Sequence, residues 1–438
     1  MAVSHLYVRS YLPSLLATLA LVGCGPSHGG GGGGGGDDDP GDVDGGQMMD
    51  GHVDHDGGTP DGNVTTCAAT ESCDGVIDDN CDGQVDENCG RCPLLTLSCP
   101  TGCCPVDRWE VSNKASYGAD IAVAADGTIY FAYTTPSSGA WTSTLAIYDP
   151  TPGTWRSVPL GGGTYRNRVR LDHLGRLHVV NASNNGAVVY RRSDDRGVSF
   201  TTPYTVGTLD IGGVFDLEVD SLGQPHIVYA QYSSQHEFAY KHLVNTQWVS
   251  ETPDIQQGNF DNPDIALGFA DRPHIVYDGY ESGNGLKKYL WHNGNRWILE
   301  TFDSAAAGLY TGFDYFSSHT LRIAANDARE LLFTRMNGGI DTMFMAKRGS
   351  GDNDAWQVTP ITGPTGFETP VMFVDTAGKL AAVGKGLAVY RESNGTMWST
   401  TALGIPGENA AVARRGKYFY IAYTADNEHP TLAVIELQ

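Results

Sequence analysis

The stretch Val219-Asp-Ser-Leu-Gly-Gln-Pro-His-Ile-Val-Tyr229 decides the fold. It predicts a strand, a tight turn at Gly223 and a second strand over 225–229, because a glycine between two apolar runs is a hairpin signal. Close copies of the stretch occur on both sides. Their turn residues are Gly127, Gly175, Gly223 and Asp271, each 48 residues after the last, and later copies turn near Asp327, Gly378 and Gly416.

Each copy belongs to a longer repeat that predicts four strands. In the repeat 263–302 we expect these strands at 264–267, 273–277, 287–292 and 296–302. A strand-rich period of about 40–50 residues is typical of a β-propeller. The hairpins therefore predict an all-β, seven-bladed β-propeller over residues 107–438. Six or eight blades are the alternatives, because the repeat near Asp327 is irregular.

The last strand of the repeat carries an aromatic residue, and the final repeat lacks that strand. The chain stops after a predicted third strand over 431–437. At the other end, Trp109 lies 46 residues before Trp155, one repeat away. We therefore expect the strand 107–112 to complete the last blade and to cover its edge. The aromatic positions of the six other repeats are Trp155, Phe200, Trp248, Trp297, Trp356 and Trp398.

Residues 1–23 predict an export signal. Arg9 precedes an apolar run over 12–22 that is too short to span a bilayer comfortably. The run ends in Leu21-Val22-Gly23-Cys24, which resembles the lipobox of bacterial lipoproteins. The resemblance implies that Cys24 is lipidated and anchors the chain in the outer membrane, in the periplasm or exposed at the surface. An ordinary secretory signal is the alternative.

The charge of the chain is concentrated near its N-terminus. Residues 25–105 carry 16 acidic side chains and one basic one, within a net charge of −23 for the chain. The Gly- and Asp-rich part, 24–66, has too few apolar groups to form a core, so we expect a disordered acidic tether. The acidic balance argues against a nucleic-acid partner, whose phosphates need Lys and Arg. We expect a monomer.

All nine cysteines precede residue 105. Apart from Cys24 they fall in the segment 67–106, which predicts a small module held by disulfides in an oxidising compartment. Their pairing stays open. The eight are Cys67, Cys73, Cys81, Cys89, Cys92, Cys99, Cys103 and Cys104.

The same module contains a pattern of oxygen-bearing side chains. Two abutting units, 73–80 and 81–88, share the pattern C-D-G-x-[VI]-D-[DE]-N, and the spacing D-x-N-x-D-G within them matches the start of a calcium loop. The stretch is similar to Cys-rich metal-binding repeats of bacterial surface proteins and to thrombospondin type-3 repeats. The resemblance implies calcium as cofactor, and a purely disulfide-held module is the alternative. The implied ligands are Asp78, Asn80, Asp82 and Asp86, with Asp74 and Glu87 as secondary candidates.

Two sets of polar residues recur in the propeller repeats. Seven residues before the turns, at the start of the innermost strands, stand Asp120, Arg168, Asp216 and Asp264. This ring at the channel mouth predicts binding of a sugar or a cation, and capping of the loop behind each Asp is the alternative. Three residues after the turns stand His178, His226 and His274, which lie too far apart to share one zinc ion. We expect these histidines to be repeat residues that are hydrogen-bonded between blades.

The segment Ser193-Asp-Asp-Arg-Gly-Val-Ser-Phe200 resembles the Asp-box, a turn between the third and fourth strands of sialidase-like propellers. Enzymes of that kind need a cluster of arginines, and Arg168 is the only arginine at the inner-strand position seven residues before a turn. The sequence therefore predicts a cell-surface protein that binds a glycan or a protein without catalysis. A glycan-active hydrolase or lyase with its site at the channel mouth is one alternative. A structural component of the envelope is the other.

Overall fold

The computed structural model describes residues 107–436, apart from short stretches at 138–139, 164–165, 210–213, 232–236, 255–260, 282–283, 303–318, 338–339, 352–353, 362–370, 375–377, 384–387, 393–397, 403–406 and 426–427. The predicted signal, tether and Cys-rich module lie outside the described residues. Among the described residues, none forms a helix with the length and hydropathy needed to cross a membrane.

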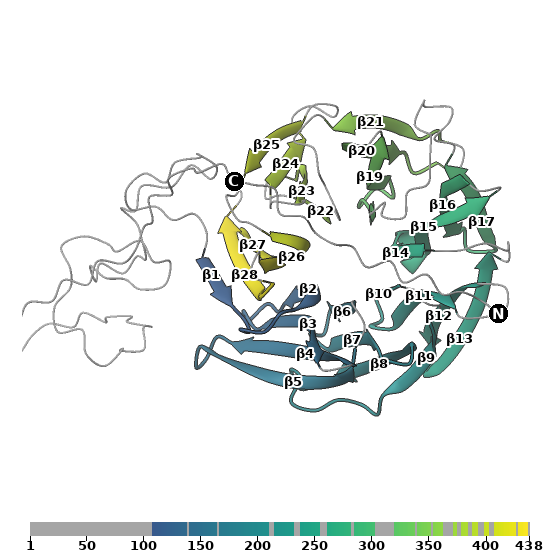
Figure 1. Cartoon of the computed structure of the whole chain (residues 1–438). Helices are drawn as coiled ribbons and strands as arrows, with labels where there is room; N and C mark the ends of the chain where they lie inside the picture. Colours follow the sequence, from purple (N-terminus) through teal and green to yellow (C-terminus); the bar gives the residue numbers. More distant parts are fainter. Residues whose placement is uncertain are drawn as a thin grey trace, which may run out of the picture. The chain divides into compact units, whose positions relative to one another are not determined.

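The described strands form seven four-stranded antiparallel sheets, arranged as the blades of a propeller (Figure 1). The first three in chain order are β2 Tyr117–Val123, β3 Ile129–Ser137, β4 Ala140–Asp149 and β5 Thr154–Gly162; β6 Asn167–Leu171, β7 Leu177–Ala182, β8 Ala187–Ser193 and β9 Tyr204–Thr208; and β10 Phe215–Val219, β11 Pro225–Gln231, β12 Glu237–Val244 and β13 Gln247–Asp254. The next two are β14 Asp261–Leu267, β15 Pro273–Glu281, β16 Asn284–His292 and β17 Trp297–Phe302; and β18 His319–Ile323, β19 Arg329–Asn337, β20 Ile340–Arg348 and β21 Gln357–Ile361. The last two are β22 Val371–Val374, β23 Leu380–Val383, β24 Ala388–Glu392 and β25 Trp398–Ala402; and β26 Gly407–Arg415, β27 Tyr418–Ala425 and β28 Pro430–Glu436 with β1 Asp107–Glu110.

The seven sheets confirm the predicted propeller and its closure. The innermost strands β2, β6, β10, β14, β18, β22 and β26 contact one another in sequence, and β26 contacts β2, so the ring is closed. The N-terminal strand β1 pairs with β28, from Asp107 opposite Val434 to Glu110 opposite Thr431. Figure 1 shows β1 beside β28, which joins the two ends of the described chain in one blade. The irregular fifth repeat also forms a hairpin, β18–β19.

The turn between the first two strands of a blade explains the repeated glycine. Gly175 and Gly223 have φ of 75° and 74°, and each donates its amide to the carbonyl of the Asp three residues earlier, at 2.9 Å. Glycine adopts this left-handed conformation without strain, and Asp tolerates it better than most residues. Asp271 and Asp327 accordingly replace glycine in two blades, with φ of 58° and 62°. A short 3-10 turn, η1 Phe269–Asp271, forms one of these two connections.

The core consists of clusters that lie between neighbouring blades. One consists of Phe215, Leu217 and Ile227 from one sheet with Val180 and Val188 from the sheet before it. The aromatic residues of the fourth strands pack at these interfaces: Trp248 stacks on Tyr204 of the preceding blade, with ring centroids 4.8 Å apart. The repeated tryptophan therefore serves the packing of one blade on the next.

Candidate ligand-binding cavity

A cavity of about 1060 Å³ occupies the centre of the ring and is lined by the innermost strands. Its wall has two chemically different arcs. Charged and polar side chains line it along β2, β6, β10, β14 and β18. On β22 and β26 the lining residues whose side chains the structure describes are apolar: Val371, Met372 and the run 410–413. All four side chains that the sequence placed at the channel mouth line this cavity. They are Asp120, Arg168, Asp216 and Asp264.

Each of the three aspartates links its own blade to the next one. Asp120 Oδ2 accepts the amide of Val169 at 2.8 Å, and Asp216 Oδ2 accepts that of Ile265 at 3.0 Å. Asp264 accepts the amide of Leu321 in the same way, at 2.5 Å. Each amide belongs to the innermost strand of the following blade. The predicted capping of the loop behind each Asp is therefore wrong, because the exposed edge of the neighbouring strand presents a closer donor.

Two arginines on β6 occupy the middle of the charged arc. Arg168 Nε donates to Asp216 Oδ1, which belongs to the next blade. Arg170 contacts Asp120 on one neighbouring blade and Glu218 on the other, each at 3.0 Å. The side chains of Arg168 and Arg170 keep 20% and 28% of their surface exposed, and that surface faces the cavity.

Sequence reasoning missed Arg170 and Glu218 as cavity residues. A signal was present, since each lies two residues after a predicted site residue, Arg168 or Asp216. Residues two apart in a strand share one face of the sheet. With the four predicted residues, Arg170 and Glu218 make six ionisable side chains in the cavity wall. They offer a polar ligand guanidinium donors, carboxylate acceptors, and ion pairs in which the two stand side by side.

Burial and neighbouring charges shift the acidities of this cluster in opposite directions. Burial acts to raise the pKa of Asp216, but Arg168 and Arg170 outweigh it and lower that pKa to about 2. Burial and the nearby Asp216 charge raise the pKa of Asp264 well above its usual value, and a hydrogen bond links the two carboxyl groups. Burial also raises the pKa of Glu218, against the opposing effect of Arg170. The cluster therefore holds one firmly ionised carboxylate beside two carboxyl groups that bind protons more readily.

A second polar group lies at the end of the cavity where the innermost strands begin. Asn262 has a φ of 49° at a bulge in β14, a conformation that non-glycine residues seldom adopt outside turns and sites. Its Oδ1 accepts from Arg166 Nη2 at 3.0 Å, so the contact joins β14 to the segment before β6 and passes over the intervening blade. Asp278 and Lys287, 2.5 Å apart, lie next to it.

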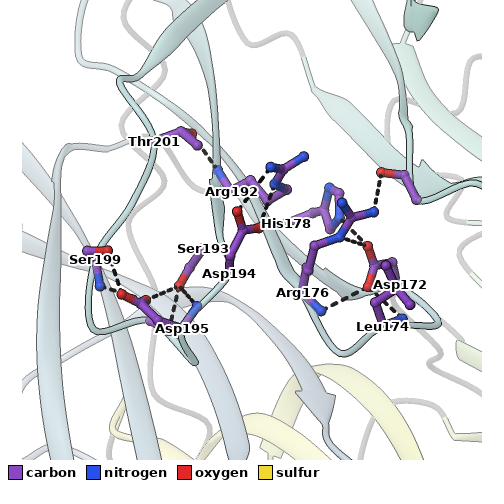
Figure 2. Close-up of polar contacts among 12 residues, drawn as sticks. Asp172, Leu174, Arg176, His178, Arg192, Ser193, Asp194, Asp195, Ser199 and Thr201 are labelled. Carbon is purple, nitrogen blue, oxygen red and sulfur yellow. Dashed lines mark hydrogen bonds and ion pairs between the residues drawn. The ribbon is translucent and has the colours of Figure 1, made fainter. Parts of the chain in front are cut away.

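The three repeated histidines are buried, and their hydrogen bonds lie within blades. His178 Nδ1 is 2.9 Å from Tyr190 Oη. Its Nε2 is 3.3 Å from Asp172 Oδ2, and Figure 2 shows these two residues side by side. His226 has the same contact with Tyr240 at 2.6 Å, and His274 has it with Tyr289 at 2.5 Å. The prediction of hydrogen bonds between blades is wrong.

The contact between blades is made by the tyrosine to which each histidine is hydrogen-bonded. The rings of Tyr190, Tyr240 and Tyr289 meet Trp248, Trp297 and Trp356 of the following blades, with centroids 5.2–5.3 Å apart. The histidine thus orients a tyrosine, and the tyrosine packs on the next blade. This role needs no metal, and among the described residues no group of three or more His, Cys, Asp or Glu side chains is arranged to hold a metal ion.

The turn 193–200 lies between β8 and β9, the third and fourth strands of its blade. Figure 2 shows the side chains of Ser193, Asp195 and Ser199 directed toward one another. Ser193 Oγ donates to Asp195 at 2.8 Å and accepts the amide of Gly197 at 2.7 Å, and Asp195 Oδ1 accepts the amide of Ser199 at 2.8 Å. These contacts hold the turn in shape through its own polar atoms.

Several predicted site residues lie outside the described residues. They are the lipidation residue Cys24, the implied calcium ligands Asp74, Asp78, Asn80, Asp82, Asp86 and Glu87, and the eight cysteines of the module from Cys67 to Cys104. Calcium binding and the disulfides stay predictions.

Comparison with known proteins shows a shared fold at low sequence identity. No protein-family model matches the chain, and no curated protein matches it in sequence. The polysaccharide lyase Uly1 is similar in structure, with a TM-score of 0.48 and 10% identity over 74% of this chain and 90% of the lyase. A family PL25 ulvan lyase, solved with a bound saccharide, has a TM-score of 0.46 and 12% identity over 65% of this chain and 80% of that one. An α-L-arabinanase of Penicillium chrysogenum has a TM-score of 0.46 and 11% identity over 74% and 95%. The chain is a β-propeller similar to these glycan-active proteins, and the likeness assigns it to no family.

Proposed function

We propose that the propeller binds a saccharide in the central cavity and does so without changing it. The observation that carries this proposal is the division of the cavity wall into a charge-paired arc and an apolar arc. Arg170 bridged to Asp120 and Glu218 offers donors and acceptors side by side, the arrangement that neighbouring hydroxyl groups need. The apolar arc suits the C–H face of a sugar ring. A volume of about 1060 Å³ leaves room for more than one ring.

The carboxyl groups of the cluster are poorly arranged for glycoside hydrolysis. Asp216 and Asp264 are in direct hydrogen-bond contact, whereas the two catalytic carboxyl groups of most glycosidases stand about 5–9.5 Å apart. Asp120, Asp216 and Asp264 also accept backbone amides of the neighbouring blades, so one oxygen of each carboxyl group already has a structural role. These contacts favour a role in holding the ring and shaping the cavity.

One observation favours glycan cleavage as a second candidate function. Glu218 is 32% exposed towards the cavity, and burial raises the pKa of its carboxyl group. A carboxyl group with a raised pKa releases its proton less readily, which is the direction that a general acid needs. The same experiment separates the two functions, since a binding protein leaves the saccharide intact.

We expect the full chain to bind members of a glycan array, and Glu218→Gln to weaken that binding about tenfold, the loss of one charge-assisted hydrogen bond. Calorimetry with the best array ligand measures the change, and chromatography of the mixture reports any cleavage. Glu300→Gln is the matched control, because Glu300 pairs with Arg348 and neither residue lines the cavity. Equal affinity of Glu218→Gln and the parent for the ligand would mean that the saccharide does not bind in the central cavity.

We also propose that the propeller is held at the outer membrane through Cys24, on the basis of the Leu-Val-Gly-Cys motif. Cells that produce the parent should incorporate a labelled fatty acid into the protein, and Cys24→Ser should lose both the label and the membrane fraction. Two acyl chains or more give stable anchoring where one does not. Equal labelling of the parent and of Cys24→Ser would exclude a lipid anchor at this residue.

A further inference from the structure

The turn between β26 and β27 carries a dense group of cations. Arg414, Arg415 and Lys417 fall within four residues around Gly416, and all three are exposed. Lys379 is exposed in the turn before β23 of the neighbouring blade. We call these four side chains the basic turn patch.

Contacts of the two arginines place the basic turn patch across three blades. Arg414 Nη1 donates to the carbonyl of Val374 at the end of β22, at 3.4 Å. Arg415 Nε donates to the carbonyl of Ala125, in the turn after β2, at 3.0 Å. A carbonyl contact fixes the Arg415 guanidinium without neutralising its charge. The patch is therefore a positioned basic surface and not a single flexible turn.

The chain enters the propeller beside this surface. Asp107 is paired with Val434, and Val434 is paired with Tyr420, so the three residues lie in one row across β1, β28 and β27. Two strand spacings separate Asp107 from Tyr420, which is about 10 Å. Tyr420 follows the basic turn by only three residues. The segment that precedes Asp107 thus begins next to the basic turn patch.

The charge of that segment is opposite to the charge of the patch. Residues 67–106 contain seven acidic side chains and one basic one, Arg91. The acidic side chains lie at positions 71–87, and the stretch 88–106 that follows reaches up to about 60 Å when extended, so distance does not limit their contact with the patch. Covalent connection raises the effective concentration of the two partners, and a weak attraction then suffices to hold them together.

We propose that the basic turn patch is the docking surface for the acidic Cys-rich segment 67–106 of the same chain. The exposed cations of two adjacent blades and the segment of net charge −6 carry opposite charges, so the attraction is electrostatic. Docking covers the turn end of the closing blade and fixes the place at which the tether leaves the propeller. The proposal does not depend on the ligand of the central cavity.

Zero-length coupling of lysine amines to carboxylates tests the proposal on the full chain. Lys379 and Lys417 should couple to acidic residues of 71–87, and Arg414→Glu with Arg415→Glu should abolish these products. Salt at about 0.5 M should reduce them as well, since it screens exposed charges within a few ångströms. Lys114 is the internal control: it is exposed and seven residues from Asp107, but it follows the opposite end of β1, where Val111 bonds to Pro430. Lys114 should form few such products.

Three results would overturn the proposal. Products that form equally at Lys114, or that survive the arginine substitutions in a protein of unchanged melting temperature, would show that chain proximity alone explains them. Products that join a labelled copy to an unlabelled copy would assign the patch to a second molecule. Products that disappear when vesicles of anionic lipid are added, with binding of the protein to those vesicles, would assign the patch to a membrane. If the substituted protein melts lower, Arg414→Gln with Arg415→Gln replaces it.

Discussion

Replacing the β1 residues Asp107–Glu110 with alternating glycine and proline should lower the free energy of unfolding by about 3–5 kcal/mol. Four residues of β1 pair in register with β28, and each backbone hydrogen bond is worth about 1 kcal/mol. Proline also removes the donors that the ladder needs. Val111, which packs in the cluster between the first and last blades, loses its place as well. For a domain of this size the melting temperature should fall by about 4–7 °C.

Calorimetry of the full chain measures this effect. The control is the same four-residue replacement in the predicted tether, at 40–43, which should leave the melting temperature unchanged. A melting temperature equal to the parent value after the β1 replacement would mean that the pairing of β1 with β28 does not close the ring in solution. Loss of solubility with a lowered melting temperature would agree with an exposed edge at β28.

Lowering the pH from 7 to 4.5 should destabilise the propeller steeply. Burial lowers the pKa of His178 and of His274 to about 4, from an ordinary value of 6.5. Between those two values the unfolded chain binds more protons than the folded one, so stability falls as the pH falls. Each histidine contributes a loss of about 3 kcal/mol over the whole interval. The sum approaches the total stability of an ordinary domain.

The contact of Asp172 with Arg176 and His178 explains why the loss of stability continues below pH 4. Contacts with Arg176 and His178 lower the pKa of Asp172 despite its burial, so this carboxylate also favours the folded state until it is protonated. Urea unfolding at several pH values gives the slope. His178→Asn should reduce the slope between pH 5 and 6 by about 1.4 kcal/mol per pH unit. A stability that stays constant between pH 7 and 5 would contradict the buried, neutral state of these imidazoles.

Periodicity predicted most of the fold because each blade repeats the same local chemistry. The 48-residue spacing of Gly127, Gly175 and Gly223 reflects a backbone conformation that every blade needs at the same point. The missing last strand was predictable for a related reason: the position of Trp109 matched the aromatic position of the other blades, and β1 occupies the expected place. Each blade needs the same residue types at its turns and packing positions, so these requirements appear in the sequence as a repeat.

Contacts between blades were harder to predict, because they depend on a register that the sequence does not state. The aspartates at the innermost strands were correctly placed around one channel, but their acceptor role for Val169, Ile265 and Leu321 required the next blade to be positioned. The partner of His178 was also missed, although it lies within the same blade. Asp172 lies six residues before it, and Asp220 lies six before His226, so a repeated Asp–His spacing was available as a signal.

The pairing of Asp107 with Val434 also fixes the order in which the protein can be completed. Six blades consist of consecutive strands and have all their parts once their own stretch has been synthesised. The seventh joins the first described strand to the last one, so it has to wait for the C-terminal hairpin. Contacts of such long range form slowly and leave open edges until they do. A chain that ends before β28 therefore cannot complete its last blade, because β1 lacks the strand with which it pairs.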